Sequence, residues 1–108
     1  MVQEIKCACC GGDNTHQIAV DVFFREEDAE TGVHAVSRFD GTKCDSVQIN
    51  NPSPRRSGLK VILRCESCSG LSNLVVYQHK GFTLIATTPI DIGEDYVKFR
   101  FGDMCTNL

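Results

Sequence analysis

Four of the seven cysteines stand in two pairs with the spacing C-x-x-C. The first pair is Cys7 and Cys10, and the second is Cys65 and Cys68. Two cysteines three positions apart can direct both sulfurs at one ion if the backbone between them turns sharply. A glycine follows each pair within two positions, and glycine tolerates the positive φ of such a turn. Four thiolates at this spacing suit a closed tetrahedral site, so the sequence predicts that these cysteines bind one Zn²⁺ ion.

Three further cysteines are not assigned to this site. Cys9 and Cys10 are adjacent in the chain, and both would rarely bind one ion without strain. We assign Cys7 and Cys10 to the site, because this pair preserves the regular spacing. Cys44 and Cys105 stand alone, and a lone cysteine is more often a small buried hydrophobe than a ligand. Disulfides are the less favoured alternative, because the count is odd and no secretory signal is present.

The separation of the two pairs is unusually long. The first pair lies close to the N-terminus and the second past the middle of the chain, whereas paired zinc ligands usually lie about 12–20 residues apart. A small sheet is therefore expected between them. The arrangement of two C-x-x-C knuckles resembles the zinc-ribbon and rubredoxin-like families, and that resemblance implies a small β fold with a four-cysteine metal site.

A second resemblance rests on Cys65-Glu66-Ser67-Cys68 and the later Gln78-His79-Lys80-Gly81. These stretches are similar to a group of small uncharacterised prokaryotic proteins, some linked to phages or mobile elements. Members of that group end in a C-x-x-C knuckle followed by a hairpin that turns at His-Lys-Gly. The resemblance covers mainly residues 64–85 and implies metal binding without an established activity. This chain continues to Leu108, well beyond the short tail usual in that group.

Alternating apolar residues predict a mostly β protein with little or no helix. The first expected strand is half-buried, with Ile18, Val20, Val22 and Phe24 recurring at period two. Asp-Gly at residues 40–41 and His-Lys-Gly at residues 79–81 predict hairpin turns, and the proline-containing segment 50–58 predicts a loop. We expect one domain over residues 1–108, built from small antiparallel sheet(s) and a zinc-ribbon-like pair of knuckles. Its six to seven short strands are expected at 18–24, 33–39, 44–49, 59–64, 74–78, 82–86 and 96–101.

Composition and motifs argue against several classes of function. A closed four-cysteine site leaves no open metal position for hydrolysis, and the sequence has no phosphate-binding glycine loop and no G-x-S-x-G, so an enzyme is not expected. The net charge of −3 argues against a general nucleic-acid binder. The absence of a signal peptide and of an apolar run near ~18 residues predicts a cytoplasmic protein without a membrane span.

One expected surface could bind a partner. On the strand predicted at 96–101, Tyr96, Lys98 and Arg100 face outward, where an aromatic ring can stack on a base and the cations can neutralise phosphate. Outward polar residues are also what any half-exposed strand shows. Five further basic residues could extend this surface, and the acidic segment 26–30 would oppose binding if it folded over the same face. The five are Arg55, Arg56, Lys60, Arg64 and Lys80.

Three functional hypotheses follow from the cysteines. The first is a non-catalytic binding module for protein or nucleic acid with a structural zinc site. The second is a rubredoxin-like electron carrier with iron on the same four cysteines, since spacing does not separate zinc from iron. The third is a thiol redox protein that uses Cys7, Cys9 or Cys10.

Overall fold

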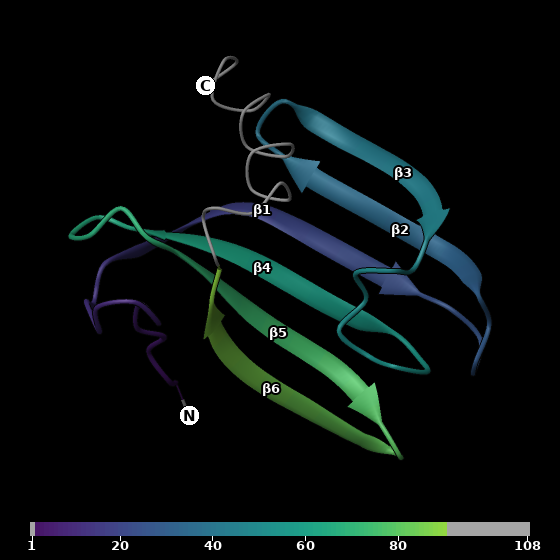
Figure 1. The fold of residues 1–108 in the computed structure, drawn as a ribbon. Helices are drawn as coiled ribbons and strands as arrows, with labels where there is room; N and C mark the ends of the chain where they lie inside the picture. Colours follow the sequence, from purple (N-terminus) through teal and green to yellow (C-terminus); the bar gives the residue numbers. More distant parts are fainter. Residues whose placement is uncertain (1, 91–108) are drawn as a thin grey trace.

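A computed structural model describes residues 2–90 of the chain. These residues form one six-stranded antiparallel sheet without a helix, so the prediction of a mostly β fold is confirmed (Figure 1). The expected strand at 96–101 lies outside the described residues. The strand order is β3-β2-β1-β4-β5-β6. The strands are β1 (Thr15–Phe24), β2 (Thr31–Arg38), β3 (Gly41–Val47), β4 (Gly58–Cys65), β5 (Leu71–His79) and β6 (Phe82–Pro89).

Both predicted hairpin turns are present. Gly41 turns β2 into β3 with a φ of 137°. Lys80 and Gly81 turn β5 into β6 with φ values of 51° and 82°. Two consecutive residues with positive φ match the twist of the flanking strands, which explains why this turn is so tight.

The position of β4 determines where the two cysteine pairs lie. The first three strands form a meander, and the connection after β3 returns so that β4 pairs with β1. The resulting order β4-β1-β2-β3 is a Greek key. Because β1 and β4 run antiparallel, Thr15 at the start of β1 lies opposite Cys65 at the end of β4. The chain before β1 and the chain after β4 therefore meet at the same end of the sheet.

A β-bulge in β1 sets which side chains are buried. The register of β1 against β4 shifts between Gln17 and Ala19. Beyond the bulge, Ala19, Asp21 and Phe23 share one side of the strand, and all three are buried. The sequence had singled out the opposite set, yet Phe24 at its end is 57% exposed. The extra residue at a bulge moves every later side chain to the other face, and periodicity alone does not reveal it.

We call the two sides of the sheet the core face and the valine face. The core face carries Ala19, Phe23 and Ile62, and Ile18 and Ile90 pack against its cluster of Ala19, Ile62 and Leu71. The loop between β3 and β4 also lies on this side, since a Cβ added to Gly58 would meet Pro52 Cγ at 2.6 Å. The valine face carries Val20, Val22, Val61 and Val76 with their cross-strand neighbours.

Candidate metal centre

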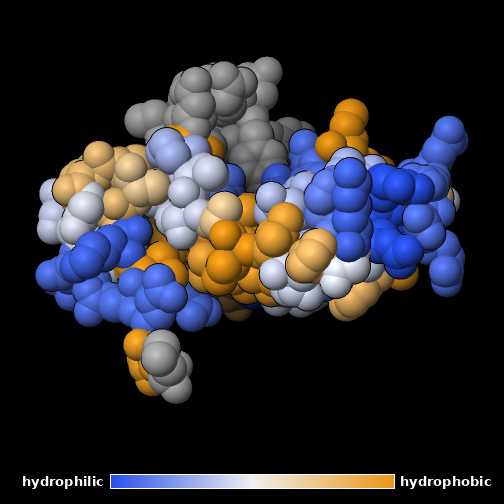
Figure 2. Space-filling model, turned by 90° about the horizontal axis from the view of Figure 1, so that it is seen from below, coloured by the Kyte–Doolittle hydropathy of each residue, from blue (hydrophilic) through white to orange (hydrophobic). Residues whose placement is uncertain are grey.

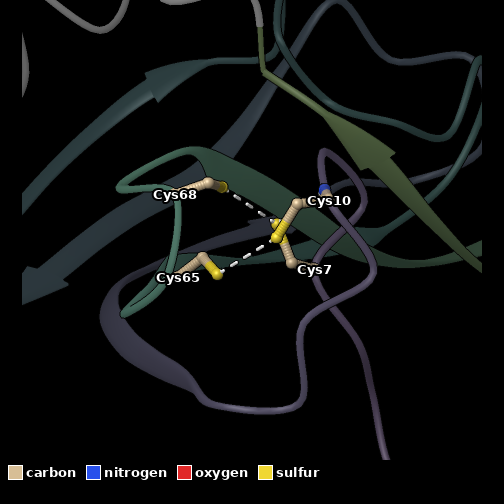
Figure 3. A group of neighbouring side chains, drawn as sticks. All are labelled: Cys7, Cys10, Cys65 and Cys68. Carbon is tan, nitrogen blue, oxygen red and sulfur yellow. Dashed lines mark hydrogen bonds between the residues drawn. The ribbon is translucent and has the colours of Figure 1, made fainter.

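The four cysteines of the two C-x-x-C pairs come together at the end of the sheet where β1 begins and β4 ends (Figure 3). All four Sγ atoms lie within 4.8 Å of one another. The distance is 3.7 Å between Cys7 Sγ and Cys68 Sγ, and 3.6 Å between Cys10 Sγ and Cys65 Sγ. In a tetrahedral zinc site with bonds of about 2.3 Å, the sulfurs are about 3.8 Å apart. The cluster therefore has the dimensions of a four-thiolate metal site.

The two knuckles, residues 7–12 and 65–70, close with the same pattern of backbone hydrogen bonds. In the first, the N–H of Cys7 donates to Gly12 O at 2.9 Å and the N–H of Gly11 donates to Cys7 O at 2.9 Å. In the second, the N–H of Cys65 donates to the carbonyl of residue 70 at 3.0 Å, and the N–H of Ser69 donates to Cys65 O at 3.1 Å. The two pairs are thus held by equivalent turns, which present their sulfurs to each other.

The glycines of the knuckles have two different roles. The positive φ falls on Gly11 in the first knuckle, at 76°, and on Ser69 in the second, at 60°. We expected Gly70 to supply the positive φ of the second turn, and this expectation is wrong. A Cβ on Gly70 would lie 2.9 Å from Cys9 Sγ and 3.1 Å from Cys68 Sγ. Gly70 is needed for space beside the sulfurs, because the backbone approaches them too closely for a side chain.

Backbone N–H groups point at the sulfurs and favour their charged form. Cys7 Sγ accepts from the N–H of Cys9 at 3.3 Å and of Cys10 at 3.4 Å, and Cys68 Sγ accepts from the N–H of Gly70 at 3.3 Å. The backbone hydrogen bond from Cys10 is the main cause that lowers the pKa of Cys7 to about 6. The N–H of Cys68 likewise lowers the pKa of Cys65. Such bonds stabilise thiolates, which are the form that binds metals.

The pKa of Cys10 shifts in the opposite direction to those of Cys7 and Cys65. The N–H of Gly12 acts to lower its pKa, but hydrogen bonds with the sulfurs of Cys68 and Cys65 outweigh it and raise the pKa to about 12. The thiol of Cys10 lies at hydrogen-bond distance from the sulfur of Cys65. A bound metal ion would take the place of the thiol proton, since metal ligation requires deprotonated cysteines.

Polar contacts anchor the knuckles to the sheet. The N–H of Ala8 donates to Ser72 Oγ at 3.0 Å, and the N–H of Glu66 donates to Asn14 O at 3.0 Å. His16 follows Cys10 by six residues, and an imidazole at that position could replace one thiolate as a metal ligand. Its ring Nε2 instead lies at hydrogen-bond distance from the carboxylate of Glu66. His16 thus joins the start of β1 to the second knuckle from outside the cluster.

Two other described cysteines, Cys9 and Cys44, are not among the four. Cys9 is exposed, and its Sγ lies 3.6 Å from the carbonyl oxygen of Leu71. Desolvation raises the pKa of this thiol, and the neighbouring Cys7 adds to the effect. Cys44 is exposed on β3, an edge strand that β2 separates from β1. Cys105 lies outside the described residues.

Most of the basic residues proposed as a partner surface are engaged or dispersed. Lys60 on β4 lies opposite Asp21, with its Nζ 6.0 Å from the centre of the Phe23 ring. Arg64 lies four residues further along β4, opposite His16. Tyr96, Lys98 and Arg100 lie outside the described residues.

Arg55 and Arg56 meet the acidic segment that follows β1. Arg55 donates to both carboxylate oxygens of Asp28 at 2.7 Å and to Glu27 at 2.9 Å, and Arg56 donates to Glu27 at 2.9 Å. The hydrogen bond from Arg55 lowers the pKa of Asp28. Glu27, Arg55 and Arg56 line one small pocket of about 130 Å³ together with Lys80. The acidic segment thus neutralises much of the positive charge that the sequence placed here.

The sequence offered no partner for His34, and the structure places it in a buried polar group. His34 and Asp21 are both buried on the core face. His34 Nδ1 lies 2.9 Å from Asp45 Oδ1, its Nε2 lies 3.9 Å from Asp21 Oδ2, and its ring stacks on Phe23 with centroids 4.3 Å apart. The register of three strands creates this contact, because Phe23, His34 and Asp45 lie opposite one another on β1, β2 and β3.

No family model, no curated protein and no solved structure matches the chain. The likeness to zinc ribbons therefore rests on the four-cysteine cluster, which is consistent with such a site. Residues 2–90 form no helix that is long and apolar enough to cross a membrane.

Proposed function

We propose that the chain is a cytosolic, non-catalytic binding module held together by one structural Zn²⁺ ion on Cys7, Cys10, Cys65 and Cys68. The observation that carries this proposal is the convergence of four Sγ atoms within 4.8 Å of one another. Four thiolates fill a tetrahedral coordination shell and leave no position for water or substrate. Such an ion stabilises the fold and supplies no reactive group.

The location of the cluster supports a structural role. Cys7 and Cys65 are buried, and the cluster joins the N-terminal segment to the end of a central strand. An ion held there fixes two parts of the chain that are distant in sequence, so metal binding and folding are coupled.

A protein partner fits the described surface better than nucleic acid. Binding of phosphate needs cations that are accessible, because affinity comes from neutralising phosphates. Arg55 and Arg56 already donate to Glu27 and Asp28, so a nucleic acid would have to displace these carboxylates. We therefore assign the binding role to a protein surface.

Metal analysis of protein purified without added metal tests the proposal. We expect one zinc ion per chain, lost in Cys65→Ser and retained in Cys44→Ser, because Cys44 lies outside the cluster. Absence of bound metal in the wild-type protein would overturn the proposal.

The same preparation distinguishes the alternatives. Visible absorption with stoichiometric iron would favour a rubredoxin-like carrier, because iron on four thiolates is coloured and zinc is not. Rapid modification of Cys9 and reversible oxidation while the metal stays bound would favour a thiol redox protein. Steep, salt-sensitive binding of single-stranded DNA or RNA would favour a nucleic-acid module.

A further inference from the structure

The valine face carries ten apolar side chains that run across five strands. The pairing of neighbouring strands places them side by side. Val20 and Leu74, for example, lie opposite Val61 from its two sides. The ten are Val20, Val22, Phe24, Val33, Ala35, Leu59, Val61, Leu74, Val76 and Ile85. None of them is fully buried, and Val33 and Ile85 are 52% and 66% exposed.

Charge is confined to the other side of the sheet. The Asp, Lys, Arg and His residues of the strands share the core face. Examples are Asp21 opposite Lys60, and Lys43 and Asp45 opposite Val36 and His34. The polar positions of the valine face are neutral, such as Ser37 and Thr87. A face left to water normally collects the charged residues of its strands. This face does the opposite, which indicates that it packs against an apolar surface.

Nothing in residues 2–90 covers the centre of the valine face. The first knuckle overlies only the end next to the cysteines, where Ala8 contacts Ser72 and Leu63 is buried. The loop between β3 and β4 lies on the core face beside Gly58, and Ile90 also packs on the core face. Seen from below, onto the edge of the sheet at β6, hydrophobic atoms lie in the middle of the molecule between two hydrophilic ends (Figure 2).

The area that residues 2–90 leave uncovered is large enough for a specific contact. Five strands about 4.8 Å apart and about six residues of about 3.3 Å each give roughly 500 Å² in projection. Two such faces would bury roughly 1,000 Å² together, the lower limit for a specific interface. The largest apolar patch on a typical monomeric protein is about 300–600 Å² and is often functional, and the valine face falls in this range.

We infer that the valine face is a self-association surface, on which a second copy of this chain packs sheet against sheet about a two-fold axis. An identical copy supplies a face of the same shape without charge, so no like charges oppose each other and no ion is desolvated. Apolar sheet faces of this kind pack about 10 Å apart. Two-fold contacts of one patch with itself are the commonest arrangement of homo-oligomers. This inference names the partner for the binding role proposed above and does not depend on which metal is bound.

The mass of the metal-loaded, full-length protein in solution tests the inference. By sedimentation equilibrium we expect a concentration-dependent dimer. Val61→Lys and Val61→Glu should each give a folded monomer, because a charge at the centre of the face would be buried against its copy. An equimolar mixture of the two variants should regain the dimer, which a merely unfolded variant would not do. Phe82→Lys is the matched control, since Phe82 is exposed on the opposite side of the same sheet, and it should remain dimeric.

A wild-type protein that stays monomeric at high concentration would overturn the inference, and so would a dimer that survives both Val61 variants. These outcomes are separate from those of the metal proposal. A monomer that carries one zinc ion would overturn self-association and leave the structural zinc site intact. A dimer that binds no metal would overturn the zinc site and leave the self-association surface intact.

Discussion

The two ends of the sheet join distant segments of the chain with different chemistry. At the cysteine end, four Sγ atoms bring together the knuckles before β1 and after β4. At the loop end, the segment after β1 meets the loop before β4 through ion pairs of Arg55 and Arg56 with Glu27 and Asp28. Both ends therefore hold the same two central strands, one with thiolates and the other with exposed charges.

The difference between the ends lies in their exposure to water. The side chains of the ion pairs are about half exposed, so water and salt screen them and their net contribution is small. Cys7 and Cys65 are buried, and structural zinc binding contributes about 10–16 kcal/mol in zinc-finger peptides at neutral pH. The loop end also depends on Ser53, a buried hydroxyl that donates to Gln78 O at 2.7 Å.

The largest expected effect is loss of the metal centre. Chelation, or Cys65→Ser, should unfold or loosen the whole sheet, since it separates β1 from β4 at the cysteine end. Circular dichroism melting with and without chelator measures this, and we expect the loss of a cooperative transition or a large fall in Tm. Cys44→Ser is the control and should melt like the wild type. An unchanged Tm after complete metal removal would show that the cluster does not stabilise the fold.

A smaller effect is expected when the space beside the sulfurs is filled. Gly70→Ala would place a methyl group 2.9 Å from Cys9 Sγ, so the second knuckle must shift. We expect a loss of about 1–3 kcal/mol, as for other overpacked sites. Zinc affinity measured by competition with a chromophoric chelator should fall in parallel. Combining Gly70→Ala with Cys9→Ala should recover part of both losses, and no recovery would contradict the steric cause.

At the loop end, Ser53→Ala should cost stability without loss of metal. The hydroxyl of Ser53 donates to Gln78 O and accepts from the N–H of Arg56 at 2.9 Å, so its removal takes this partner from two partly buried backbone groups. The expected loss is about 1–3 kcal/mol in urea denaturation. Thr42→Ala, at an exposed hydroxyl pair on β3, is the control. Loss of bound metal in Ser53→Ala would show that the two ends are coupled.

The smallest effect is expected from Arg55→Ala, which removes exposed ion pairs. Arg55 lowers the pKa of Asp28 below its ordinary value of 3.8 in the folded state. The pair therefore stabilises the fold above pH 3.8, and this contribution is lost as the pH falls through the lower folded pKa. The small difference in urea midpoint between variant and wild type should vanish in acid and in high salt. A difference that persists in both conditions would contradict an electrostatic origin.

Local patterns were enough to predict much of this molecule. Cys7 with Cys10, and Cys65 with Cys68, could be read as pairs because the turn between two such cysteines involves only neighbouring residues. Alternation of apolar residues located the strands to within a few residues, and Asp40-Gly41 and His79-Lys80-Gly81 identified the hairpins. These signals are local, because a strand's period and a turn's φ values depend on adjacent residues.

Other features required the tertiary structure, since they depend on which strands pair and in what register. The sequence predicted that the two knuckles share one site, but the way they meet depends on β4 returning beside β1. The burial of Phe23 depends on a bulge that no periodicity reveals. The contact of His34 with Asp45 and the neutralisation of Arg55 by Asp28 likewise join segments that are distant in sequence. A sequence specifies each strand by short-range preferences, but strand order and register are settled only when all strands bury their apolar surface together.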